Sequence, residues 1–192
     1  MQINPFWFVI PLRGKASSND WEAVSRDVRR TLRSVLNQSD GRFRVLLSCA
    51  EVPDLANISD ERLTILTGAY PVARTFMEKA SDKRAKKRAA GAYLGERGGG
   101  YVMLLDADDY VSRDLVKHVL TNDNRSGYYF DEGYILYALT NTVEKIGSFF
   151  KKCGSCYIAY FEPEELPKNR TDENTAFEAY KNHRLARETA AE

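Results

Sequence analysis

The apolar positions of residues 1–120 follow two alternating patterns. Residues 6–12, 43–49 and 62–67 form short, nearly continuous apolar runs, which are typical of buried strands. Between the first two runs, apolar residues recur every three or four positions and predict a helix, with Trp21, Val24, Val28, Leu32, Val35 and Leu36 on its inner side. Asn19 followed by Glu22 resembles a capping box and predicts where that helix starts. This alternation predicts an α/β fold with a mostly parallel sheet.

A second helix is predicted over residues 81–94, which are rich in lysine and arginine. Ala85, Ala89 and Tyr93 share its inner side, and Gly95 with the glycines at 98–100 ends it. Asp82 and Lys86 lie four residues apart, next to the alanine side, so they are better placed than Lys87 to face a ligand. The alternative interpretation is a solvated run of charges.

Three carboxylates follow the next apolar run, residues 101–105. Asp106, Asp108 and Asp109 come directly after it, before a further predicted helix over residues 111–120. Ligands of open α/β sheets bind at the carboxyl ends of the strands, and oxygen ligands there suit Mg²⁺ or Mn²⁺ carrying substrate phosphates. We therefore expect a metal-assisted nucleotide site, with Asp109 either a third carboxylate of that site or a helix cap.

Composition changes after residue 121. Residues 127–137 and 154–161 are strand-like and aromatic, with Tyr128, Tyr129, Phe130, Tyr134, Tyr137, Tyr157, Tyr160 and Phe161. Such residues favour a packed β-structure, and the alternative is a platform on which sugar rings stack. We expect a single domain over residues 1–192, with a nucleotide-sugar half (1–120), an acceptor half (121–170) and a C-terminal helix or tail (171–192).

Composition and charge narrow the class of protein. With 192 residues and 43% hydrophobic content, one full core is expected. The 28 basic and 27 acidic residues balance, so net charge gives no support for a nucleic-acid partner or a membrane-surface role. No apolar run is long enough for a transmembrane segment, and no leader peptide is recognisable, which leaves peripheral membrane association as the membrane role to consider.

The three cysteines, Cys49, Cys153 and Cys156, cannot all pair within one chain. They predict reduced thiols and a cytoplasmic location. Residues 153–156 have CxxC spacing, but no second pair and no nearby histidine accompany them, which favours a structural interpretation over zinc binding or redox chemistry.

Two separate motifs resemble the inverting glycosyltransferases of family 2. The first is RTLRSVLNQS at residues 30–39, where family helices commonly end in an Asn-Gln-Ser or Asn-Gln-Thr pattern. The second is LLDADDYVSRDLV at residues 104–116, which is similar to the family's metal motif. The resemblance covers roughly residues 6–120 and more loosely 127–163. It implies a GT-A fold, a nucleotide-diphosphate sugar donor, a glycan or polysaccharide acceptor and a divalent metal, Mn²⁺ or Mg²⁺.

The resemblance also assigns roles to individual residues. Asp106 matches the first aspartate of the DxD motif, near the ribose and the metal, and Asp108 matches the last, a direct metal ligand. Pro11, Leu12 and Arg13 match the loop that cradles the nucleotide base.

At two positions the sequence departs from the family pattern. The aspartate that usually ends the second strand is missing, and Glu51 is the residue we expect to take over its contact with the base. The family's Arg-Asn segment is also replaced, with Asp82 and Lys86 as the expected ligand-facing residues.

Inverting transfer requires a carboxylate that deprotonates the acceptor hydroxyl. Two acidic pairs follow the metal motif, residues 131–132 and 172–173, and we expect Asp172, before a helix-like segment at 175–187, to be the base. An ordinary helix cap is the alternative role for Asp172. The family usually continues beyond this length, so the chain is also consistent with a fragment. The competing functions are a sugar nucleotidyltransferase, whose glycine-rich phosphate loop is only weakly suggested by residues 11–15, and a non-catalytic sugar-nucleotide-binding module.

Overall fold

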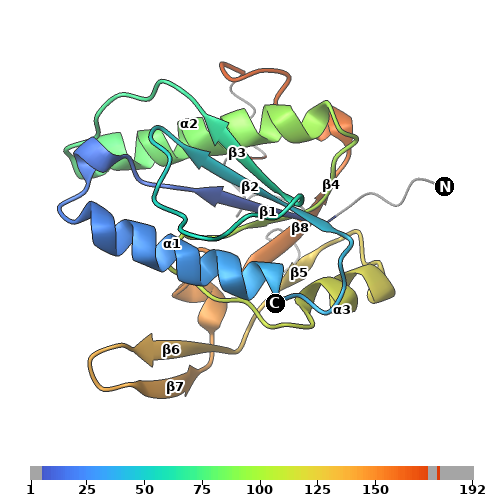
Figure 1. Cartoon of the computed structure of the whole chain (residues 1–192). Helices are drawn as coiled ribbons and strands as arrows, with labels where there is room; N and C mark the ends of the chain where they lie inside the picture. Colours follow the sequence, from blue (N-terminus) through green and yellow to red (C-terminus); the bar gives the residue numbers. More distant parts are fainter. Residues whose placement is uncertain (1–5, 173–176, 178–192) are drawn as a thin grey trace.

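The computed structural model describes residues 6–172 and Phe177. Their main feature is a six-stranded sheet in the order β3-β2-β1-β4-β8-β5 (Figure 1). Its strands are β1 (Phe6–Pro11), β2 (Phe43–Cys49), β3 (Leu63–Thr67), β4 (Gly100–Leu104), β5 (Tyr128–Tyr129) and β8 (Tyr157–Phe161). β3, β2, β1 and β4 are parallel, and β8 runs antiparallel to both of its neighbours. The predicted α/β class with a mostly parallel sheet is confirmed.

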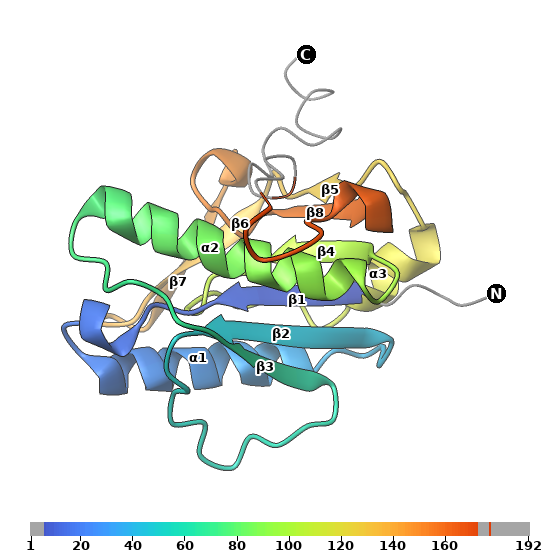
Figure 2. The same cartoon turned by 90° about the horizontal axis from the view of Figure 1, so that it is seen from above.

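Helices cover both faces of this sheet (Figure 2). α1 (Trp21–Leu36) and α3 (Leu115–Asn122) pack on one face, in a core that includes Phe8, Ile10 and Leu32. α2 (Phe76–Gly95) packs on the other face, in a second core that includes Trp7 and Leu94. Successive side chains of a strand point to opposite faces of the sheet, so each strand contributes residues to both cores. This is why β1, β2 and β4 are apolar nearly throughout. The described residues also contain three short 3₁₀ helices: η1 (Lys15–Ser17), η2 (Phe149–Lys151) and η3 (Pro163–Glu165).

The helix starts differ from those predicted. α1 is capped by Asp20, whose Oδ1 accepts from the Ala23 amide at 2.9 Å, so the predicted cap at Asn19 is wrong by one residue. α2 begins five positions before residue 81, where Thr75 and Glu78 form a reciprocal capping box. The first turn of α2 was missed because Phe76 and Met77 are exposed and do not follow the apolar pattern of the rest.

Two further predicted elements are corrected. α3 begins at Leu115 rather than at residue 111. Residues 111–114 instead form a loop that is hydrogen-bonded to Ser34 of α1 and to Gln38 just after it. The predicted strand over residues 127–137 is two strands: β5 joins the main sheet, whereas β6 (Gly133–Tyr137) pairs with β7 (Thr142–Ile146) in a hairpin that projects from the body (Figure 1). β7 was not predicted, because all of its residues except Ile146 are exposed and it lacks an apolar pattern.

The two predicted halves share one sheet, since β8 pairs with β4 over Gly100–Met103. The close approach of this pairing depends on Gly99, which has φ +68° and whose carbonyl accepts from the Trp7 indole at 3.0 Å. The helix predicted at residues 175–187 and the tail at 188–192 lie outside the described residues, apart from Phe177, which is buried against Phe161. Within residues 6–172, no helix has the length and apolar character needed to cross a membrane.

Candidate functional site

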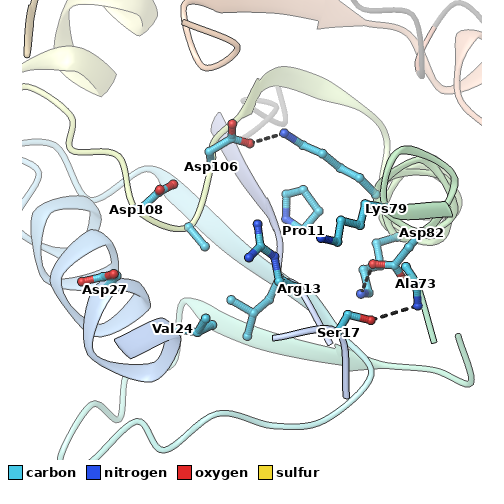
Figure 3. Close-up of a pocket in the computed structure, with 14 residues that line it drawn as sticks. Pro11, Arg13, Ser17, Val24, Asp27, Ala73, Lys79, Asp82, Asp106 and Asp108 are labelled. Atoms are coloured by element: carbon cyan, nitrogen blue, oxygen red, sulfur yellow. Dashed lines mark hydrogen bonds and ion pairs between the residues drawn. The ribbon is translucent and has the colours of Figure 1, made fainter. Parts of the chain in front are cut away.

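A pocket of about 410 Å³ opens at the carboxyl ends of β1 and β4, between the first halves of α1 and α2 (Figure 3). These strands are adjacent, with Val9 paired to Leu104, and the Leu105 amide donates to the Val9 carbonyl at 2.9 Å. The residues that follow the two strands therefore emerge side by side. On the β1 side the wall is made by Pro11, Leu12, Arg13 and Ser17, and α1 adds Val24 and Asp27. The structure thus brings the three residues expected at the nucleotide base to one cavity.

The carboxylates after β4 line the opposite part of the wall. Asp106 and Asp108 both face the pocket, with Ala107 between them. The Asp106 amide donates to Ser155 Oγ at 2.8 Å, and this bond links the segment after β4 to the segment before β8. Gly154 lies close to the same carboxylate, since a Cβ there would stand 3.6 Å from Asp106 Oδ2. The CxxC segment is therefore part of the support for the acidic strand end.

The second half of α1 and the residues just after it hold the segment that contains and follows the aspartates. Thr31 Oγ1 donates to the Ala107 carbonyl at 2.9 Å. The side chain of Gln38 makes two hydrogen bonds. Its Nε2 donates to the Ser112 carbonyl at 2.7 Å, and its Oε1 accepts from the Val116 amide at 3.0 Å. The two sequence motifs at 30–39 and 104–116 are therefore in direct contact, although about seventy residues separate them.

Asp108 and Asp109 have different environments. Asp108 opens to the pocket, and partial removal from water raises its pKa, with the charges of Asp109 and Asp106 adding to the rise. Asp109 is in contact with Cys153, whose Sγ donates to its Oδ2 at 3.5 Å. Asp109 is not among the described residues that line the pocket, and α3 takes Asp114 rather than Asp109 as its N-cap.

The opposite side of the pocket is basic. Lys79, Lys83 and Lys86 line it from consecutive turns of α2. Asp82 lies on the same wall, where Figure 3 labels it with Lys79. Lys86 is 1% exposed, pairs with Asp82 at 2.6 Å and stands 5.0 Å from the centre of the Tyr70 ring. The predicted shared face of Asp82 and Lys86 is confirmed, and the alternative of a solvated charge run does not describe this pair.

Lys83 reaches across the pocket and forms an ion pair with Asp106 Oδ1. Lys79 lines the same wall and has no ion-pair partner among the described residues. Neither lysine was selected from the sequence. The available signal was their spacing with Lys86, at four and then three residues, which places all three on one side of a helix. This signal was lost because the helix was expected to begin at residue 81, after Lys79.

Glu51 and Asp172 lie apart from this constellation. Glu51 Oε2 accepts from the Lys15 amide at 2.9 Å and holds the loop after β1, but Glu51 is not among the described residues of the pocket wall. Asp172 lies in the turn after η3, where its Oδ2 accepts from the Lys168 amide at 2.9 Å, and it too is absent from the described wall. Their roles in base recognition and catalysis stay predictions.

The donor set fits a divalent cation only together with a ligand. Within residues 6–172, no group of three or more histidine, cysteine, aspartate or glutamate side chains is arranged to hold a metal. Asp106 and Asp108 supply two carboxylates at the pocket. Mg²⁺ is commonly held by one or two carboxylates plus substrate phosphates and water, so these two residues suit a metal that binds together with a diphosphate.

All three cysteines are free. Burial raises the pKa of Cys49 to about 11. Burial is also the main cause that raises the pKa of Cys153 to about 11, with Asp109 adding to the rise. At neutral pH Cys49 and Cys153 are therefore thiols rather than thiolates, which makes them poor nucleophiles.

Comparison with models of known protein families and with curated proteins finds no match to this chain. The functional interpretation therefore depends on the residues of the pocket and on the motifs that form it.

Proposed function

We propose that this protein is an inverting glycosyltransferase of the GT-A type, which transfers a sugar from a nucleotide-diphosphate donor to a glycan acceptor. The observation that carries the proposal is the pocket itself, where two aspartates of a DxD motif face three lysines of α2 across the carboxyl ends of adjacent parallel strands. Carboxylates that suit a hard cation and ammonium groups that suit phosphate oxygens are the pair of chemistries a nucleoside diphosphate needs.

In the proposed sugar transfer, the leaving group is a nucleoside diphosphate, and the pocket must stabilise it. A divalent cation, when bound, neutralises charge that develops on the phosphate oxygens. Lys79 and Lys83 supply further positive charge from the opposite wall, whereas Lys86 is held in its buried ion pair with Asp82. Pro11, Leu12 and Arg13 would then border the base and ribose, since they follow β1 on the same edge.

Ligand binding is the first test. Calorimetry with a panel of nucleoside diphosphates and their sugars, each with and without Mn²⁺, should show binding that requires the metal. Asp108→Ala should abolish the metal-dependent part. Asp131→Ala is the matched control, because Asp131 is an exposed carboxylate outside the described wall of the pocket. Equal nucleotide affinity in wild type and Asp108→Ala with Mn²⁺ present would contradict the proposal.

Transfer is the second test, and Asp172 is the proposed base. Asp172→Asn should leave donor and metal binding unchanged and lower the transfer rate by ~10²-fold or more, the usual scale for an acid–base group. Transfer at the wild-type rate would leave Asp172 as a residue that only holds its turn through Lys168.

One observation favours a second candidate, a non-catalytic sugar-nucleotide-binding module. Asp172 is held in its turn by the Lys168 amide and is not among the described residues of the pocket wall, so that wall contains the two expected metal ligands but not the expected base. A wild-type chain that binds nucleotide sugars with Mn²⁺ but transfers no sugar to any of a panel of acceptors would select this candidate.

A further inference from the structure

The carboxylate of Asp106 already has a cation next to it, and that cation belongs to the protein. Its Oδ1 pairs with the Lys83 ammonium group, while its Oδ2 lies beside Gly154. The two side chains are 35% and 42% exposed, so the pair can open into the pocket without leaving a buried charge behind. The oxygen directed toward α2 is thus the one that Lys83 holds.

Lys83 differs in this respect from the two lysines on either side of it. Lys86 is 1% exposed and is held by Asp82 of its own helix. Lys79 has no acidic partner in the part of the chain that the structure describes. Lys83 is therefore the pocket lysine whose partner is itself an expected metal ligand.

We propose, on the basis of the function proposed above, that Lys83 is a diphosphate-binding residue that Asp106 holds until a divalent cation displaces it. A divalent cation bound by Asp106 would repel an ammonium group a few ångströms away. The released ammonium group of Lys83 would then be available to bind phosphate oxygens of a donor in the same pocket. The reverse also holds, because a diphosphate that draws Lys83 away exposes Asp106 to the metal.

Metal and nucleotide binding are consequently coupled through this one side chain. Each ligand raises the affinity of the protein for the other by the same factor, as linkage requires. Part of that coupling is lost when Lys83 is replaced by an uncharged residue.

The first measurement is the affinity for Mn²⁺ alone, from the electron paramagnetic resonance signal of free Mn²⁺. Lys83→Met should bind Mn²⁺ about threefold or more tightly than the control Lys79→Met, which corresponds to the upper range for a partly exposed ion pair. Lys79→Met removes the same charge from the same face of α2, one turn earlier, so it accounts for the general effect of a lysine on a nearby cation.

The second measurement is the affinity for a nucleoside diphosphate, by calorimetry with and without Mn²⁺. With Mn²⁺ present, Lys83→Met should bind about tenfold more weakly than wild type, the scale of one charge-assisted hydrogen bond. The factor by which Mn²⁺ improves nucleotide binding should be smaller in Lys83→Met than in wild type. Lys83→Gln serves as a second variant, and both must retain the wild-type circular dichroism spectrum.

The outcomes separate this inference from the function on which it rests. A wild-type protein that binds neither Mn²⁺ nor any nucleoside diphosphate overturns both. A wild-type protein that binds both, with Lys83→Met and Lys79→Met equal in Mn²⁺ affinity and in coupling, overturns the role of Lys83 alone.

Discussion

The hydroxyl of Thr31 donates a hydrogen bond to the carbonyl of Ala107 at 2.9 Å, and this bond joins the middle of α1 to the middle residue of the Asp-Ala-Asp segment. Thr31 is fully buried, so its hydroxyl cannot exchange this bond for one with water. The position of Asp106 and Asp108 therefore depends on a helix that contributes none of the expected metal ligands.

Thr31→Val should test this dependence. The substitution preserves the shape of the side chain and leaves the Ala107 carbonyl without its donor, which should cost about 1 to 2 kcal/mol of the free energy of unfolding. Urea denaturation followed by tryptophan fluorescence measures the loss. Thr31→Ser, which keeps the hydroxyl, should recover most of the bond's contribution, and a Thr31→Val protein as stable as wild type would contradict this role.

Gln38 offers a second, independent test of the contact between the two motifs. Gln38→Met removes the bonds to the Ser112 carbonyl and from the Val116 amide, and it should destabilise the protein by about 2 kcal/mol, since both backbone groups lose a partner. Gln38→Glu keeps an acceptor for Val116 and should lose only part of that stability. If denaturation midpoints show equal loss in the two variants, the Val116 bond contributes little.

Asp108→Asn should stabilise the ligand-free protein at neutral pH. The pKa of Asp108 is raised in the folded state, so stability falls as the pH rises above the unfolded pKa, and the full penalty is present once the pH exceeds the folded value. Below the unfolded pKa of about 3.9 the carboxyl is protonated in both states, and the advantage of asparagine should disappear. Melting temperatures at pH 7 and pH 3.5 measure the difference. Asp131→Asn, at an exposed carboxylate, should show no such pH-dependent gain.

Gly99→Ala should disrupt the junction between the parallel and antiparallel parts of the sheet. A Cβ at this φ of +68° would lie 2.3 Å from the Phe161 carbonyl oxygen, too close to be relieved without moving β8. We expect a loss of at least about 3 kcal/mol or failure to fold. Gly41→Ala is the control: no atom lies within 4 Å of its Cβ, and its effect should stay within about 0.5 kcal/mol.

The native thiols should react slowly with iodoacetamide at pH 7.5. Cys49 and Cys156 are fully buried, and the raised pKa of about 11 keeps both Cys49 and Cys153 protonated. Mass spectrometry should find three alkylated cysteines per chain after unfolding without reductant, and the rate for half-buried Cys153 should rise as the pH approaches 11. Rapid native labelling at pH 7.5, or fewer than three thiols after unfolding, would contradict this prediction.

Local patterning in the sequence is enough to locate most of the structure that forms the pocket. The apolar run before Asp106 must be buried, so its polar end must emerge at an edge, and the same reasoning applies to Pro11 after β1. The spacing of Asp82 and Lys86 likewise places them on one face of a helix wherever that helix packs. These inferences succeed because they depend on periodicity and burial within a single element.

Contacts between distant segments could not be inferred in this way, and they define the site's electrostatics. The sequence around Lys83 resembles any run of solvated charges, and its pairing with Asp106 exists because the fold places α2 beside the residues that follow β4. Asp109 is separated from Asp108 by one peptide bond, yet it turns toward Cys153 because β8 inserts antiparallel beside β4. Strand order, the choice of ion-pair and hydrogen-bond partners, and side-chain direction at the ends of elements are set by packing across the whole fold. The free energy of folding that decides them comes from burial between residues distant in sequence, which no local pattern contains.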